Sequence, residues 1–202
     1  MDTANKVDWE SFPFSTSPQY SHYHGECYEK IGKRVAAMAL RCIGKPKKVV
    51  EYGCGGGHNL KPIQFFAPDA SMTGIEIYKE TLDVAKQRVP GIVDVLIDPM
   101  KPEGALPKAE GCDLFICVHV IQHLPDRAYA DRVIKLAYDS LVSSGVLLIQ
   151  FVVGFLDAGR LRWNVYKSEE ECLDSLSKAG FVIADRRTMV EPDYLYVAAV
   201  KP

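Results

Sequence analysis

The stretch KVVEYGCGGGHNL, residues 48–60, constrains the fold more than any other part of this 202-residue chain. Val49 and Val50 are β-branched and apolar, as a buried parallel strand requires. Four glycines then break regular structure, at Gly53, Gly55, Gly56 and Gly57. Glycine adopts positive φ without steric cost and lets a ligand lie against the backbone. In an open α/β sheet, a loop at the carboxyl end of a strand is where ligands bind.

Two nucleotide-binding patterns do not match this loop. A dinucleotide fold requires G-x-G-x-x-G, but the third glycine would fall at His58 or at Leu60, depending on where the count starts. A P-loop requires G-x-x-x-x-G-K-[ST], and no Lys-Ser or Lys-Thr pair follows these glycines. What remains is an acidic residue followed by alternating glycines, Glu51-x-Gly53-x-Gly55-x-Gly57. The alternative at this point is a glycine-rich turn that binds nothing.

The composition excludes several classes of protein. A chain of 202 residues, 48% hydrophobic and 25% charged, is typical of one globular domain. The net charge is −2 and no Lys/Arg run reaches five residues, so we expect no nucleic-acid partner. No apolar stretch has transmembrane length and the polar N-terminus is unlike a signal peptide, so we expect no membrane partner and a cytoplasmic location. The six cysteines form no C-x-x-C pair and are interpreted as reduced core thiols.

Hydrophobic periodicity predicts alternating strands and helices after an aromatic N-terminal arm, residues 1–26, and a single domain over residues 27–202. Helices are expected near residues 27–42, 59–66, 79–88, 126–141 and 168–179. Further strands are expected at residues 71–77, 92–97, 114–118, 146–153, 181–187 and 194–200. The turn Ser143-Ser144-Gly145 is expected to separate the fourth of these helices from the strand that follows it.

Acidic residues and histidines follow the predicted strands. Glu76 ends the strand at residues 71–77, about twenty residues beyond the glycines, and Asp98 follows the strand at residues 92–97. After the continuous apolar run of residues 114–118 come His119 and His123, the latter within the sequence H-L-P-D.

Together these features resemble the class I (Rossmann-like) S-adenosylmethionine (SAM)-dependent methyltransferases, and the region after residue 113 resembles their small-molecule branch. The resemblance covers the chain from about Cys27. It implies a doubly wound α/β domain with a seven-stranded, mostly parallel sheet in the order 3-2-1-4-5-7-6. It also implies helices on both faces, a final antiparallel hairpin, and an N-terminal helical arm that closes over the cofactor, SAM.

The resemblance also implies which residues bind the cofactor. The glycine backbone would face the methionine portion of SAM, Glu51 would orient its amino end, and Glu76 would accept both ribose hydroxyls. The other cofactor-binding residues implied are Gly53, Cys54, Gly55, Gly57, Asn59, Ile77, Asp98, Pro99, Met100, Val118, His119 and Tyr20. Glu76 as an ordinary strand-end carboxylate and Asp98-Pro99 as a simple turn are the alternatives.

The residues that would bind the methyl acceptor lie in the segments with the weakest sequence pattern. His119 is the first candidate for a general base and His24 the second, since histidine exchanges protons near neutral pH. Substrate-binding candidates are Tyr23, His24, His119, Arg162, Trp163 and Tyr166. The alternatives are that His119 only orders its loop, that the arm packs as surface, and that residues 154–167 form a solvated loop. His123 is interpreted as structural, and no metal site is expected.

The function that the resemblance implies is methyl transfer from SAM to an O or N atom of a small-molecule acceptor by direct displacement. A general base that removes the proton of the acceptor is optional in this reaction. The signature of DNA and protein amino-group methylation is absent, because the chain reads Val118-His119-Val120-Ile121 after the strand. Two other interpretations stay open, a catalytically silent SAM-binding regulatory or scaffold subunit and an oxidoreductase on a related sheet. The oligomeric state expected is a monomer or homodimer.

Overall fold

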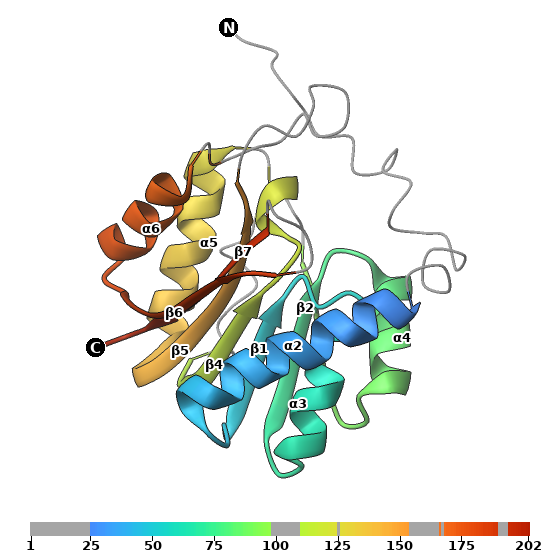
Figure 1. Cartoon of the computed structure of the whole chain (residues 1–202). Helices are drawn as coiled ribbons and strands as arrows, with labels where there is room; N and C mark the ends of the chain where they lie inside the picture. Colours follow the sequence, from blue (N-terminus) through green and yellow to red (C-terminus); the bar gives the residue numbers. More distant parts are fainter. Residues whose placement is uncertain (1–24, 98–109, 125, 154–165, 167, 190–193) are drawn as a thin grey trace, which may run out of the picture.

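A computed structural model describes residues 25–97, 110–124, 126–153, 166, 168–189 and 194–202. Within these ranges, one central sheet is covered by helices on both faces (Figure 1). The strands are β1 Lys48–Tyr52, β2 Ser71–Glu76, β3 Val93–Leu96, β4 Cys112–Cys117, β5 Leu141–Val152, β6 Val182–Thr188 and β7 Tyr194–Val200. The helices are α2 Gly25–Ile43, α3 Leu60–Phe66, α4 Lys79–Arg88, the 3₁₀ turn η3 Ile121–His123, α5 Arg127–Ser140 and α6 Glu169–Lys178.

The strand order is β3-β2-β1-β4-β5-β7-β6, as the resemblance implied. The five strands from β3 to β5 in this order pair in parallel, whereas β7 is antiparallel to both β5 and β6. Parallel neighbours need a crossover connection, and helices supply it. The carboxyl ends of β1, β2 and β4 therefore meet at one edge of the sheet, where the glycine loop begins.

The two faces of the sheet carry two separate cores. In β4, Leu114 and Ile116 pack with α2, α3 and α4, while Phe115 and Cys117 pack with α5 and α6. All four side chains are fully buried. Because both faces are covered, the strand is apolar at successive positions instead of at alternate ones. No helix in the described ranges is long and apolar enough to span a membrane.

Strand β5 begins five positions before the Val146 start that the sequence indicated. Leu141 already pairs with Cys112, through an irregularity in the register of β4 and β5. The Ser144 N–H donates to the Lys201 carbonyl at 2.7 Å, and the Lys201 N–H donates to the Gly145 carbonyl at 3.0 Å. The predicted separation of helix and strand at residues 143–145 is therefore wrong, since the carboxyl-terminal residues hold this segment to the sheet.

Asp113 fixes the start of β1 against β4. Its Oδ2 accepts hydrogen bonds from the Lys47 and Lys48 N–H groups, both at 2.7 Å. Hydrogen bonds to a charged acceptor contribute more than neutral ones. The carboxylate thus joins two strands that lie more than sixty residues apart in the sequence.

We expect Asp113→Ala to lower the free energy of unfolding by about 1–3 kcal/mol, because two backbone donors lose a charged acceptor. Urea denaturation measures this quantity. Asp139→Ala is the control, because Asp139 forms an exposed ion pair with Lys135 on α5 and such pairs contribute little. A loss for Asp113→Ala no larger than that of the control would contradict the role assigned to Asp113.

Candidate functional site

The Gly53–Gly57 loop is held to strand β2 by backbone hydrogen bonds. The N–H groups of Gly53 and Cys54 both donate to the Ile75 carbonyl, at 2.8 and 3.0 Å. The Gly57 N–H donates to the Cys54 carbonyl at 2.9 Å and closes the turn. The loop therefore starts where the sequence predicted and its shape is tied to the neighbouring strand.

Glycine is suited to two positions of the loop for different physical reasons. Gly53 has φ +70°, and a Cβ there would lie 2.2 Å from Cγ2 of Val120, so glycine allows the segment after β4 to close on the loop. Gly55 has φ +49°, and a Cβ there would meet no atom within 4 Å in the described part of the chain. Beside Gly55 the loop thus has an open side against which a ligand can lie.

Glu51 is fully buried at the carboxyl end of β1. Its Oε1 accepts from Nδ2 of Asn59 at 2.6 Å, while its Oε2 has no hydrogen-bond partner among the described residues. Burial raises the pKa of Glu51 to about 8; the Asn59 hydrogen bond opposes this and the Glu76 carboxylate adds to it. A buried acceptor without a donor is a position for a ligand donor, and a cation suits it best because it stabilises the carboxylate.

Glu76 connects the end of β2 to the glycine loop. Its Oε2 accepts from the Gly55 N–H at 2.9 Å and its Oε1 accepts from the Ile77 N–H at 2.7 Å. Burial raises the pKa of Glu76, and the backbone donors of Ile77, Gly55 and Tyr78 oppose the shift. A carboxylate has about four lone-pair positions, and these three donors leave about one of them for a ligand hydroxyl.

His119 lies directly after β4 in the left-handed backbone region, with φ +60°. Its N–H donates to Oε1 of the fully buried Gln150 at 2.9 Å, and its ring meets the Tyr194 ring edge-on, with 5.4 Å between centroids. Burial lowers the pKa of His119 to about 4, and His123 adds to the effect. The sequence interpretation assumed an ordinary pKa, whereas this imidazole is neutral at pH 7 and a weaker base than an exposed one.

Other predicted cofactor residues pack near the loop. Val118 and Cys54 are buried, and a Cβ on Gly74 would lie 2.7 Å from the Cys54 Sγ, so the thiol faces β2. Ile77 is partly buried and packs against the core that contains α5. Within the described residues, no three His, Cys, Asp or Glu side chains are grouped as ligands for a metal ion.

Tyr166, predicted to contact the acceptor, is 1% exposed. Its hydroxyl donates to Oδ1 of Asp131 at 3.0 Å, and its ring packs edge-on against Phe151, with 5.1 Å between centroids. These contacts hold the Tyr166 side chain inside the core, and a contact between Tyr166 and an acceptor stays a prediction. Predicted site residues outside the described ranges are Tyr20, Tyr23, His24, Asp98, Pro99, Met100, Arg162 and Trp163.

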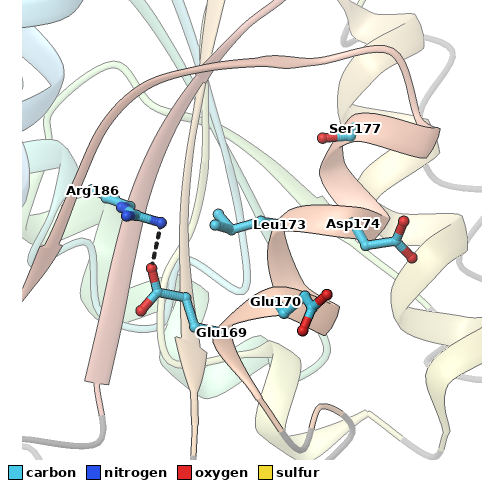
Figure 2. A pocket seen from close by; sticks show the side chains of 6 residues that line it. All are labelled: Glu169, Glu170, Leu173, Asp174, Ser177 and Arg186. Carbon is cyan, nitrogen blue, oxygen red and sulfur yellow. Dashed lines mark ion pairs between the residues drawn. The ribbon is translucent and has the colours of Figure 1, made fainter.

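A shallow depression between α6 and β6 belongs to another part of the fold (Figure 2). Its lining residues are Glu169, Glu170, Leu173, Asp174, Ser177 and Arg186. Arg186 on β6 is ion-paired with Glu169, with 2.6 Å between Nη1 and Oε1. None of the predicted site residues that the structure describes lines this depression, and β6 is the edge strand farthest in the sheet order from β1 and β2.

Comparison with known proteins identifies the family to which this site belongs. The family model described as a methyltransferase domain matches residues 22–180, more than half of the chain. The chain belongs to the class I SAM-dependent methyltransferases.

Two curated relatives of this methyltransferase have low sequence identity to it. Ubiquinone biosynthesis O-methyltransferase of Methylobacterium sp. (strain 4-46) is 26% identical over 157 residues, which cover 70% of this chain and 62% of that protein. Trans-aconitate 2-methyltransferase of Methylobacterium radiotolerans is 27% identical over 133 residues, which cover 65% of this chain and 46% of that protein. The chain therefore spans less than two thirds of the length of either relative.

A solved structure shows the same fold. The SAM-bound amino pentose methyltransferase CalS10 of Micromonospora echinaspora superposes with a TM-score of 0.71 at 16% identity, covering 91% of this chain and 97% of that one. The cofactor of this methyltransferase is SAM. The residues present fit SAM, because its methionine portion carries an ammonium group. Oε2 of Glu51, which has no donor among the described residues, would accept a hydrogen bond from that group.

Sequence reasoning missed two residues of this methyltransferase that contact His119. Gln150 is the one polar residue in the predicted apolar strand Val146–Val153, and a buried polar side chain in such a strand is a signal of a specific partner. Tyr194 carries no comparable signal, because a tyrosine after a turn is ordinary at the start of a strand.

We expect Glu51→Gln to change how the stability of the ligand-free protein depends on pH. Because the pKa of Glu51 is raised from 4.5 to about 8, its contribution to stability is complete below pH 4.5 and is lost as the pH rises through 8. The free energy of unfolding of Glu51→Gln relative to wild type should therefore rise between about pH 5 and pH 8, by at least about 1.4 kcal/mol.

Urea denaturation at several pH values measures this difference. His58, His119 and His123 have pKa values lowered to about 4. Their contribution to the free energy of unfolding is therefore lost as the pH falls from 6.5 through 4. Both proteins carry these histidines, and their effect cancels in the comparison. Parallel pH profiles for the two proteins would show that Glu51 is ionised in the native state at neutral pH.

Proposed function

We propose that this methyltransferase transfers the methyl group of SAM to an oxygen or nitrogen atom of a small molecule by direct displacement. The observation that carries the proposal is the buried Glu51 carboxyl, whose Oε2 has no donor among the described residues, at the end of the strand that leads into the glycine loop. The names of the two curated relatives, a ubiquinone biosynthesis O-methyltransferase and a trans-aconitate 2-methyltransferase, support a small acceptor.

The cofactor-binding roles proposed follow the geometry of the loop. Glu51 binds the ammonium group of SAM and is held by Asn59, while the remaining lone-pair position of Glu76 accepts a ribose hydroxyl. The loop backbone at Gly53, Gly55 and Gly57 lies against the methionine portion. The resemblance assigns Ile77, Asp98, Pro99 and Met100 to the adenine, and Tyr20 and Val118 to the rest of the cofactor.

When bound, SAM supplies a methyl group that is already activated by its sulfonium. The protein has to align the acceptor with this methyl group and exclude water, and orientation contributes about 7–11 kcal/mol at best. His119 is neutral at pH 7 and can take a proton from an acceptor hydroxyl or ammonium, with His24 as the second candidate. Acceptor contacts are proposed for Tyr23, Arg162, Trp163 and Tyr166.

Cofactor binding is tested by thermal shift with S-adenosylhomocysteine (SAH), SAM and NAD on the wild type, Glu51→Gln and Glu76→Ala. A ligand that binds the native state raises Tm with concentration. We expect SAH and SAM to raise Tm and NAD to have no effect. Each substitution should weaken the apparent SAH affinity about tenfold or more, the loss expected for a hydrogen bond to a charged group.

Glu80→Ala is the matched control for this titration, because Glu80 is an exposed carboxylate in the first turn of α4. It should leave the SAH response unchanged. The absence of any Tm rise with SAH and SAM in the wild type would overturn the proposed function, and a rise with NAD alone would favour an oxidoreductase.

The proposed base has a characteristic pH dependence. With the pKa of His119 at about 4, kcat/KM for a hydroxyl acceptor should stay level from about pH 8 to about pH 5 and fall only as the pH approaches 4. His119→Gln should lower this rate, measured at saturating SAM, by about 10²–10⁴-fold. An acidic limb near pH 6.5 that persists in His119→Gln would exclude His119 as the base.

A further inference from the structure

Arg88, the last residue of α4, contacts the glycine loop on a different side from the open space beside Gly55. Its Nη1 donates a hydrogen bond to the Gly56 carbonyl and lies 3.1 Å from Nε2 of His58. A Cβ on Gly56 would lie 2.7 Å from this Nη1 and 3.2 Å from Cγ1 of Val84, so the end of α4 packs directly on the loop. Arg88 is not among the residues that the sequence predicts for the site.

The contact with His58 sets the state of that imidazole. Arg88 has only donors, so Nε2 of His58 must be unprotonated in order to accept. Burial lowers the pKa of His58 to about 4; Arg88 adds to this, Glu29 of α2 opposes it, and Lys61 of α3 lowers it further. Burial also lowers the pKa of Arg88, but an arginine stays charged at neutral pH.

The carboxylate of Glu76 and the guanidinium of Arg88 hold two successive residues of the loop. Glu76, at the end of β2, accepts from the Gly55 N–H at 2.9 Å, and Arg88, at the end of the following helix, donates to the Gly56 carbonyl. The Gly55 N–H and the Gly56 carbonyl belong to the peptide groups on either side of the Gly55–Gly56 peptide, so both ends of this dipeptide are held by a charged side chain. The loop conformation is therefore set by residues 71–88 as well as by its glycines.

We propose that Arg88 is a positioning residue for the cofactor, which holds the Gly56 carbonyl and His58 so that the loop keeps the shape in which SAM meets Gly55 and Glu51. The inference rests on the proposed cofactor roles of these two residues. A simpler role for Arg88 is that of a basic residue that stabilises the carboxyl end of a helix. Lysine would fill that simpler role equally well, but its single ammonium lacks the planar fork of donors.

The test compares the wild type with Arg88→Met, Arg88→Lys and Arg186→Met. SAH affinity is measured by calorimetry, Tm without ligand by melting, and the pKa of His58 by NMR titration. Arg186→Met is the matched control, because Arg186 is exposed on β6 and paired with Glu169. We expect Arg88→Met to weaken SAH affinity about tenfold, Arg88→Lys to recover only part of the loss, and Arg186→Met to have no effect.

The pKa of His58 gives an independent measurement. In Arg88→Met it should rise toward 6.5, because one of the causes that lower it is removed. Unchanged SAH affinity in Arg88→Met, full recovery in Arg88→Lys, or an unchanged His58 pKa would each overturn the inference. If the wild type bound no SAH while the His58 pKa rose in Arg88→Met, the proposed function would fail and take the positioning role with it, leaving only a structural contact.

Gly56→Ala provides a second variant that retains the arginine. Gly56 does not have positive φ, and the nearest atom to the new Cβ would be the flexible end of Arg88, which would have to move away. We expect a loss of SAH affinity similar to that of Arg88→Met, and no further loss when the two substitutions are combined. Losses that add in the double variant would overturn the inference, because they would show that Gly56 and Arg88 act separately.

Discussion

The enclosure of one carboxyl group at the end of the central strand is the constraint on which the surrounding geometry depends. An ion removed from water costs several kcal/mol unless it is paired, so Glu51 must either keep a proton or receive a cation. Asn59 satisfies one of its oxygens, and no described residue donates a hydrogen bond to the other. The open side of the loop at Gly55 and the absence of a donor to Oε2 among the described residues are therefore both consistent with a ligand that completes the site.

Much of the fold was predictable because its signals are local. The strands are buried on both faces, so they appear as short continuous apolar runs. Two helices start at residues whose side chains cap them: Ser168 accepts from the Glu171 N–H at 3.2 Å and Asp126 from the Tyr129 N–H at 2.7 Å. The start of β5 was not predictable, because it depends on a long-range pairing with β4 and on the chain end, and neither leaves a trace in the local sequence.

The candidate site also contains features that the local sequence predicts and contacts that it does not. Glu51 and Glu76 were predictable because each is an acidic residue at the end of an apolar strand. The contacts of Arg88 with Gly56 and of Gln150 with His119 join residues 32 and 31 positions apart, and periodicity carries no information at such distances. The lowered pKa of His119 was equally hidden, since it follows from burial that only the assembled fold creates.

The backbone of His119 has a consequence for engineering this protein. A side chain in the left-handed region costs about 1–2 kcal/mol relative to glycine, and histidine is kept here in spite of that cost. Selection for thermal stability alone would thus favour glycine at position 119 and remove the imidazole from the end of β4. The most stable variants of this chain and the most active ones would then differ at position 119, the proposed base.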